Sequence, residues 1–517
     1  MTELDHPSAA SQDPIRDYLR LFVKDDEDLL EHVLIVCFSS FSSNPLNLGV
    51  MAPSSEGKSY VVSLVADLFK RATHITGSSA KAFFYENGTY VEEVEGENGQ
   101  KAYADLQGKV DQLKKRIVQD REDSSAREEF RALMSKALLK VNMDRRIIVF
   151  SEPPGAELFE ALKPLLSHDK WESIYQTVDK AGSGELRTKK ILLVGWPAFI
   201  FCSAKNLDAW SMWPEIQSRC VIVSPRMDES KYRHANDLTA KLLGLPSFAL
   251  RQLFPPDLEI AAREAVRDVE LSMDRMRLLG QSEGAGSKRD NFVFNPFADQ
   301  LSELFPHEQG VMMRQFSYLM KYVNMLTLTR VAKRPKLIIR DQARASIATL
   351  EDVQNAIRLV STSIWAAVPA YKLAFCTDVL ESAFIQAGNS PVSTKLLLSV
   401  ARSKGMKIGP DSLRKTYLVP LEEAGLAVSE VDPTDKRSLV WSPVQMPQKY
   451  GRLRDSTNFS LLSTKRSLKS CSDGIGDLVL VFDKGYVWSG TEVLTLRENR
   501  VIWKTGGANH GPQPPTA

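Results

Sequence analysis

The stretch from residue 47 to residue 69, NLGVMAPSSEGKSYVVSLVADLF, constrains the fold more than any other part of this chain. A short apolar run is followed by a small polar loop, and a helix with apolar periodicity begins at Lys58 and Ser59. This strand, loop and helix order is typical of a nucleoside-triphosphate site, where loop N–H groups and the helix N-terminus hold the phosphates. We expect Lys58 to reach the β- and γ-phosphates of ATP and the Ser59 hydroxyl to bind Mg²⁺. The residues expected at the nucleotide are Ala52, Pro53, Ser54, Ser55, Glu56, Gly57, Lys58, Ser59 and Tyr60.

The motif departs from the usual spacing pattern at its first position, where Ala52 stands in place of glycine. Alanine lacks the free access to positive φ that glycine has, so we expect a slightly different loop there. A Gly-Lys-Ser tripeptide also occurs by chance, and the alternative interpretation is a solvated helix start. The strand before the loop and the helix after it favour the nucleotide site.

The composition indicates an ordinary soluble protein of roughly three domains, with 43% hydrophobic and 25% charged residues. The net charge is +2, so any contact with nucleic acid has to come from local basic patches. The N-terminus is polar and no apolar run approaches the length of a membrane span, so we expect no membrane partner and a cytoplasmic, nucleoid-associated protein. The cysteines form no Cys-x-x-Cys pair and predict buried thiols in a reducing compartment; they are Cys37, Cys202, Cys220, Cys376 and Cys471.

A second candidate motif lies at residues 146–152, where a β-branched run ends in Ser151 and Glu152. A carboxylate at the carboxyl end of a buried strand lies beside the phosphates and can polarise the attacking water, so Glu152 is the candidate general base. An aspartate usually stands where Ser151 is and supports the Mg²⁺ ligands. The alternative is a parallel strand that merely ends in a surface glutamate.

Residues 171–194 alternate around a glycine-rich turn and predict a β-hairpin. Basic residues gather near its tip and are candidates for DNA phosphate contacts, the alternative being a solvated tip; they are Lys180, Arg187, Lys189 and Lys190. A buried strand follows at 198–202, and a polar residue just beyond it could hold the lytic water or the γ-phosphate. Asn206 is the better candidate and Ser203 the second. Residues 74–100 predict strands and turns, and residues 105–140 predict a solvated helical pair.

These segments, in this order, resemble the core of the AAA+ ATPases, and most closely the minichromosome maintenance (MCM) replicative helicases. HITGSSAKAF is similar to the family's segment after the phosphate loop, VDKAG to its hairpin before sensor 1, and PEIQSR to its arginine-finger segment. VMMRQFSYLMKYVNMLTLTRVAKR resembles the sensor 2 helix, and TLEDVQNAIRLVSTSI the segment that closes the lid. The resemblance implies that Arg219 is the arginine finger and Arg314 the sensor 2 arginine; a buried structural arginine is the alternative for each.

An arginine finger acts on the ATP of the neighbouring subunit, so the resemblance also implies a homo-oligomeric ring, expected as a hexamer. Fewer than fifty residues precede the phosphate loop, which leaves no room for the family's N-terminal DNA-binding tier. This departure puts autonomous duplex unwinding in question. A replication partner would then replace the missing tier.

The segment 371–445 changes character, with three stretches of helical spacing followed by a strand-turn-strand pattern. It resembles a winged helix, which is also found at the C-terminus of MCM proteins. In the DNA-reading version the third helix enters the major groove, so Arg414 and Lys415 would face DNA, with Lys436 and Arg437 on the wing. A winged helix used for protein contact is the alternative.

We therefore expect an α/β protein with an AAA+ P-loop core, a helical lid, a winged helix and a small β region. The expected divisions are an N-terminal helical lead (1–44), the ATPase core (45–235), the helical lid with sensor 2 (236–370), the winged helix (371–445), a basic linker (446–475), and a β region with a disordered tail (476–517). The expected function is that of an ATP-dependent helicase or translocase acting on DNA in replication. The alternatives are a replication initiator or loader, and an ATP-binding scaffold with little hydrolysis.

Overall fold

The structure is a computed structural model of the chain. It describes residues 13–76, 79–95, 101–120, 122–180, 186–204, 213–227, 229–281, 292–305, 310–331, 334, 336–339, 342–366, 372, 375–406, 408–423, 426–433, 435, 438–443, 479–482, 486–489, 492–495 and 500–503. Within these residues no helix has both the length and the apolar character needed to cross a membrane.

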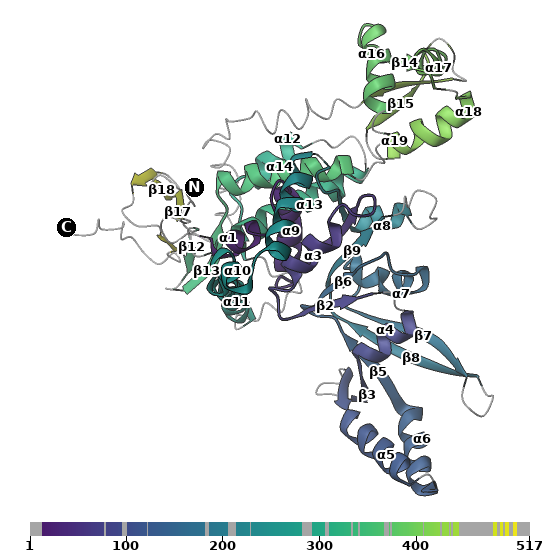
Figure 1. Cartoon of the computed structure of the whole chain (residues 1–517), viewed down its shortest axis with the longest axis vertical. Helices are drawn as coiled ribbons and strands as arrows, with labels where there is room; N and C mark the ends of the chain where they lie inside the picture. The colour runs from purple at the N-terminus through teal and green to yellow at the C-terminus, as the bar shows by residue number, and fades with distance from the viewer. Residues whose placement is uncertain are drawn as a thin grey trace.

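The protein is of mixed α/β class and is organised around a five-stranded sheet in which every pair of neighbours is parallel (Figure 1). The strand order is β10-β1-β9-β6-β2. Its strands are β1 (Asn47–Met51), β2 (Ala72–Ile75), β6 (Ile147–Phe150), β9 (Ala198–Ser203) and β10 (Val221–Val223). Strands β6, β9 and β10 are buried at every position, as expected for parallel strands covered on both faces.

Helices cover both faces of this sheet (Figure 1). Leu48 and Val50 of β1 point to one face, where they share a core with α2 (Glu27–Ser39) and α3 (Lys58–Ala66). Phe150 and Phe201 point to the other face and pack with α4 (Ala80–Asn87) and α7 (Ala156–Leu166). On the face that carries Phe201, position 49 of β1 has no room for a side chain, because a Cβ on Gly49 would lie 2.6 Å from the Phe201 ring.

A second five-stranded sheet, of order β4-β3-β5-β8-β7, is formed by two insertions into the parallel sheet. Its strands are β3 (Gly88–Glu95), β4 (Lys101–Asp105), β5 (Ala137–Asn142), β7 (Glu172–Lys180) and β8 (Leu186–Val194). Helices α5 (Gln107–Gln119) and α6 (Ser124–Lys136) form the expected helical pair, which projects from the body of the protein (Figure 1). The predicted hairpin at 171–194 is confirmed as the antiparallel pair β7–β8.

The prediction of strands and turns throughout 74–100 is wrong at α4. The Ser79 hydroxyl accepts a hydrogen bond from the Ala82 N–H at 3.2 Å, which caps the start of this helix. Phe83 and Phe84, 2% and 0% exposed, then place its apolar side in the core. A cap and two buried rings therefore override the turn-rich composition around the helix.

The range 236–370, expected to be a helical lid, contains short strands as well as helices. Its elements are α9 (Glu229–Gly244), α10 (Ser247–Leu253), α11 (Pro256–Gln281), β11 (Val293–Phe294), α12 (Ala298–Leu304), α13 (Gly310–Thr329), β12 (Lys336–Ile339), β13 (Gln342–Ile347) and α14 (Leu350–Ala366). Strands β12 and β13 pair antiparallel. The N-terminal helix α1 (Pro14–Arg20) leads to a turn whose Phe22 stacks on Phe254, with ring centroids 5.1 Å apart.

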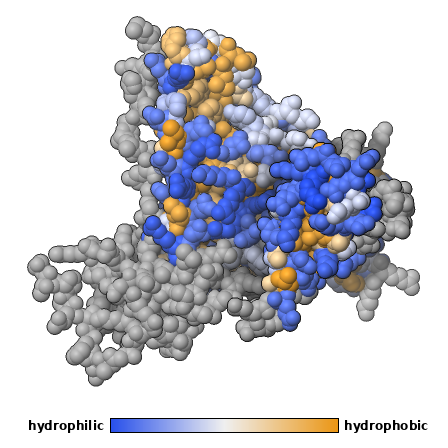
Figure 2. Space-filling view, turned by 90° about the horizontal axis from the view of Figure 1, so that it is seen from below, coloured by the Kyte–Doolittle hydropathy of each residue, from blue (hydrophilic) through white to orange (hydrophobic). Residues whose placement is uncertain are grey.

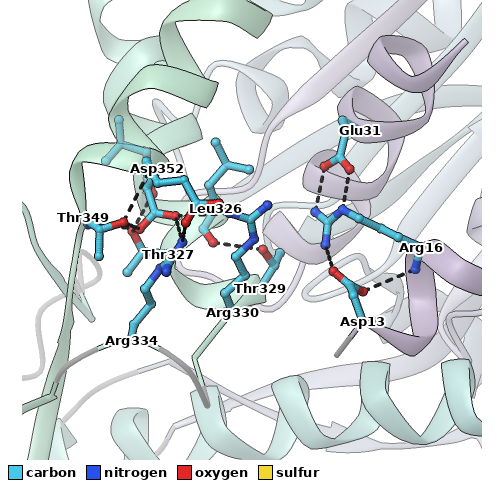
Figure 3. A network of polar contacts seen from close by, with 12 residues as sticks. Asp13, Arg16, Glu31, Leu326, Thr327, Thr329, Arg330, Arg334, Thr349 and Asp352 are labelled. Atoms are coloured by element: carbon cyan, nitrogen blue, oxygen red, sulfur yellow. Dashed lines mark hydrogen bonds and ion pairs between the residues drawn. The ribbon is translucent and has the colours of Figure 1, made fainter. Parts of the chain in front are cut away.

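A buried polar network joins α13 to α14 (Figure 3). The Asp352 side chain is 0% exposed and accepts hydrogen bonds from the Thr327 hydroxyl at 3.2 Å and from Arg334 at 2.6 Å. It also accepts from the N–H of Thr349 at 3.0 Å, while the Thr349 hydroxyl accepts from the Asp352 N–H at 3.4 Å. These reciprocal bonds form a capping box at the start of α14.

Replacing Asp352 with alanine should lower the free energy of unfolding by about 3 kcal/mol or more, because it takes from the Arg334 guanidinium the one of its two carboxylate partners that is fully buried. The neighbouring Glu351 also binds Arg334, but its side chain is 59% exposed, so Glu351→Ala should cost less than about 1 kcal/mol. Chemical unfolding of the two variants measures the difference. Equal losses would contradict the assignment of the buried network as the main support of this helix pair.

Residues 375–443 form a smaller unit in which helical segments pack on a three-stranded antiparallel sheet of order β14-β16-β15. Trp441, 1% exposed, anchors its core. Its elements are η2 (Cys376–Glu381), α16 (Ser382–Gln386), β14 (Val392–Ser393), α17 (Thr394–Ser403), α18 (Pro410–Ser412), η3 (Leu413–Leu418), α19 (Val419–Glu423), β15 (Ala427–Val431) and β16 (Leu439–Pro443).

Short strands form the described part of the C-terminal region, as the sequence predicts. They are β17 (Val479–Phe482), β18 (Tyr486–Ser489), β19 (Glu492–Thr495) and β20 (Arg500–Trp503). Strand β20 pairs in parallel with β12. The predicted basic linker at 446–475 and the predicted disordered tail at 506–517 lie outside the described residues.

Candidate nucleotide site

The loop between β1 and α3 is a tight turn with two residues in the left-handed region. Its left-handed residues are Ser55, with φ +71°, and Gly57, with φ +76°. Ala52 does not have a positive φ, so alanine at this position strains nothing. The Ala52 N–H donates to the carbonyl of Ser203 at 3.2 Å, which ties the start of the loop to the end of β9. The departure from glycine that the sequence shows therefore has no consequence for the loop backbone.

Lys58 folds back over this loop. Its ammonium donates to the carbonyls of Ala52, at 2.8 Å, and of Pro53. The residue is 7% exposed, and burial lowers the pKa of its ammonium. Residues 54 and 55 form a hydrogen-bonded turn, and the first N–H groups of α3 have no partner within the helix, as at any helix start. Free N–H groups and a partly desolvated ammonium together make a site for an anion such as a triphosphate.

Ser59 lies against the carboxyl end of β9. Burial raises the pKa of the Cys202 thiol, and a hydrogen bond with the Ser59 hydroxyl opposes that shift. In the register of the sheet, Met51 of β1 is level with Ser203. The Ser59 hydroxyl is thus held beside the strand that separates β1 from β6. Tyr60, the next residue, is 47% exposed.

Glu152 lies at the same edge of the sheet as the phosphate loop. Phe150 pairs with Phe201, so position 152, two residues later, is level with Ser203 and hence with Met51 of β1. One strand separates β6 from β1, which places their ends about 10 Å apart. The Glu152 side chain is exposed. Asn206, the other candidate for orienting water, lies outside the described residues.

Arg219 lies at the opposite edge. It ends α8 (Trp213–Arg219) just before β10, and Val221 pairs with Leu48. Arg219 is therefore level with position 46, roughly 16 Å along the strands from the end of β1 at Met51. Its guanidinium donates to the Ser167 hydroxyl at 2.6 Å and to the carbonyl of Glu215 at 2.9 Å.

Arg314 is exposed on α13 and lies on the same side as Arg219. One helical turn further, the Tyr318 hydroxyl donates to the carbonyl of Ser218 at 3.2 Å. Burial raises the pKa of Tyr318, and the nearby charges of Arg314 and Arg219 oppose that shift. Both predicted arginines therefore lie near Tyr318, and Arg219 lies at the edge of the sheet opposite the phosphate loop.

The predicted DNA contacts are described only in part. The backbone of Lys180, Arg187 and Lys189 lies in the β7–β8 hairpin, while their side chains lie outside the described residues. The side chain of Lys190 is exposed. In the smaller C-terminal unit Arg414 and Lys415 are exposed on η3. Lys436 and Arg437 lie outside the described residues.

Two residues of α9 belong to this site although the sequence pattern did not indicate them. The Lys231 ammonium donates to the carbonyl of Glu56 at 3.0 Å. The Tyr232 hydroxyl donates to the Glu56 carboxylate at 3.2 and 3.0 Å. Both contacts span about 175 positions of the chain, so no local spacing could have predicted them.

No model of a known protein family matches this sequence, and no curated protein matches it significantly.

Proposed function

We propose that this protein is an ATP-dependent motor that engages DNA, an AAA+ ATPase resembling the MCM helicases. The observation that carries the proposal is the common edge of the parallel sheet at which Lys58, Ser59 and Glu152 lie. A loop with free N–H groups, an ammonium and a hydroxyl stand there opposite an exposed carboxylate. These groups are the ones that bind and cleave a nucleoside triphosphate.

In the proposed reaction the loop N–H groups and Lys58 bind the β- and γ-phosphates, and Ser59 supplies a protein ligand to Mg²⁺. Mg²⁺ bound in this way neutralises phosphate charge. A hydroxyl, phosphate oxygens and waters suit this ion, which keeps several of its waters in proteins. Glu152 then accepts a proton from, or orients, the water that attacks the γ-phosphate. Ser151 adds no charge to this site, which leaves Glu152 as the carboxylate of the pair.

Assembly into a ring is part of the proposal because Arg219 lies at the edge of the sheet opposite its own phosphate loop, and Arg314 lies near the same tyrosine as Arg219. Arginines on that side would serve the ATP of a neighbouring subunit. Head-to-tail contacts of this kind close into rings. Large apolar side chains are also exposed near the turn from α9 to α10, among them Leu243 at 84% and Phe248 at 71%, as is common at protein interfaces. On the face drawn in Figure 2 apolar side chains gather in patches separated by hydrophilic surface.

Contact with DNA is assigned to the β7–β8 hairpin and to the smaller C-terminal unit. In the chain, the hairpin lies between β6, which Glu152 follows, and β9. A movement at the nucleotide would therefore be transmitted along the chain to the start and end of the hairpin. The C-terminal unit, with helical segments followed by the β15–β16 pair, has the element order of a winged helix. Arg414 and Lys415 on its third helical segment would then contact DNA phosphates or bases.

The test is ATP hydrolysis with and without single-stranded and forked DNA, for the wild-type chain and for Glu152→Gln. We expect DNA to stimulate wild-type turnover. Glu152→Gln should lower kcat by about 100-fold or more and leave ATP binding intact, because it removes the general base and not the phosphate contacts. The exposed Glu157, in the first turn of α7, provides a matched control as Glu157→Gln.

The outcomes separate the candidate functions. Strand displacement coupled to turnover identifies a helicase. Sequence-specific DNA binding with slow turnover and no unwinding identifies an initiator or loader. Nucleotide binding with no hydrolysis in any DNA condition identifies an ATP-binding scaffold, in which Ser151 in place of an acidic residue would be the physical cause. Absence of nucleotide binding would overturn the proposal.

A further inference from the structure

Three segments that are distant in the sequence meet beside the phosphate loop. They are the turn at Asp25 and Asp26, the loop residue Glu56, and the first turns of α9. Lys231 lies at their junction with a side chain only 11% exposed. Three oxygens surround its ammonium: the carbonyl of Glu56 at 3.0 Å, the carbonyl of Arg226 at 2.8 Å, and the Asp26 carboxylate at 2.8 Å.

The charge of Lys231 is matched within the protein. Asp26 has a side chain that is 3% exposed, and it accepts a hydrogen bond from the Arg226 N–H at 3.1 Å. Burial raises the pKa of its carboxyl group, and the contact with Lys231 opposes that shift. Removing one member of a buried ion pair leaves the other charge desolvated and is strongly destabilising, whereas removing both can be neutral. Asp26 and Lys231 therefore act on stability as a pair.

Lys231 also has a contact that stability alone does not require. Its ammonium donates a hydrogen bond to the Glu56 carbonyl, which lies in the phosphate loop directly before Gly57 and Lys58. The hydroxyl of the neighbouring Tyr232 donates hydrogen bonds to the carboxylate of the same glutamate. The pKa of the Lys58 ammonium is lowered mainly by burial, and the charge of Lys231 adds to this lowering, so the two ammonium groups lie within electrostatic range.

The other end of the cluster fixes α9 to the N-terminal turn. Asp25, in the left-handed region with φ +59°, accepts a hydrogen bond from the Ser230 hydroxyl at 2.7 Å and pairs with His234. Helix α9 is thus bound in its first two turns to both the N-terminal turn and the phosphate loop. A shift of the loop at Glu56 has to move α9 or break these contacts.

We propose that Lys231 is a positioning residue that holds the phosphate loop in its binding conformation and couples the loop to α9. The inference rests on the proposed nucleotide site. Lys231 acts through the Glu56 carbonyl and does not itself contact the nucleotide. Ordering of the loop around a triphosphate is then transmitted to the first turns of α9, and from there to the lid.

The experiment separates positioning from stability with two substitutions. Lys231→Met leaves Asp26 buried and unpaired, so it should lower both the melting temperature and the affinity for a fluorescent N-methylanthraniloyl derivative of ATP. The double variant Asp26→Asn with Lys231→Met removes both charges and keeps an acceptor for the Arg226 N–H. It should recover most of the melting temperature, while the Kd for the ATP derivative stays raised by about tenfold or more. Lys241→Met, exposed near the other end of α9, is the matched control.

A second readout follows amide hydrogen exchange in residues 229–234 on addition of ATP. Exchange should slow in the wild-type chain and stay unchanged in the double variant. Recovery of both melting temperature and affinity in the double variant would overturn this inference alone, because Lys231 would then be only the partner of Asp26. Failure of the wild-type chain to bind the ATP derivative would overturn the proposed function, and this inference with it.

Discussion

ATP hydrolysis should fall by about 1,000-fold or more when Arg219 is replaced by alanine, with little change in the Kd for ATP. The guanidinium lies at the amino edge of the parallel sheet, level with position 46, whereas the phosphate loop begins beyond Met51 at the carboxyl edge. Arg219 therefore cannot reach the nucleotide of its own chain. It can stabilise transition-state charge only on the nucleotide of a neighbouring subunit.

Mixing two inactive variants tests this arrangement directly. Arg219→Ala subunits keep an intact phosphate loop, and Lys58→Ala subunits keep an intact arginine. In a mixed assembly some intact loops face an intact arginine, so turnover should reappear and should depend on the mixing ratio. Failure to recover any turnover, in assemblies shown to contain both variants, would contradict the action of Arg219 on a neighbour.

A structural role for Arg219 has to be separated from this catalytic one. Its guanidinium donates to the Ser167 hydroxyl at 2.6 Å and to the carbonyl of Glu215. Ser167→Ala removes one of these partners and keeps the arginine, so it should retain turnover. If Ser167→Ala loses as much activity as Arg219→Ala, local packing explains the loss and the arginine finger is not needed.

Strands β1, β6, β9 and β10 of the central sheet were predictable from the sequence because they are almost entirely buried, whereas the edge strand β2 is only partly buried and was not predicted. Such strands form continuous apolar runs, as in residues 147–150 and 198–202, and these runs are visible without any partner. The second sheet was less accessible, since β5 pairs with β8 across about fifty residues of chain. Helix α4 was missed because the cap at Ser79 and the burial of Phe83 and Phe84 outweigh the local turn residues.

The candidate site divides in the same way. The loop at residues 52–60 is a local feature, so its spacing was enough to predict a role for Lys58 and Ser59. The positive φ values fall at Ser55 and Gly57, so Ala52 causes no backbone strain. The contacts of Glu56 with α9 are long-range and have no local signature. The distinction between the two edges of the sheet, which separates Glu152 from Arg219, became visible only from the strand register.

Replacing Lys58 with alanine should abolish ATP turnover and weaken ATP binding by roughly tenfold to a hundredfold, the range expected for losing a hydrogen bond to a charged group. The ammonium is 7% exposed and already lies over the loop, bound to the carbonyl of Ala52 at 2.8 Å. It needs only to exchange these carbonyls for phosphate oxygens. Burial lowers the pKa of this ammonium because it removes water from the charge. A bound phosphate would replace that water with oxygen acceptors and would also pair with the positive charge.

Lys58→Arg tests whether charge alone is enough. A guanidinium keeps the positive charge but is planar and larger than the ammonium, and the loop holds the Lys58 side chain nearly buried. Turnover should therefore stay close to that of Lys58→Ala, while the salt dependence of ATP binding should resemble that of the wild type. Unchanged turnover in Lys58→Ala would mean that hydrolysis occurs elsewhere, and the phosphate-loop assignment would be wrong. If the wild-type chain binds ATP without hydrolysing it and Lys58→Ala loses that binding, the site assignment stands and the scaffold function is favoured.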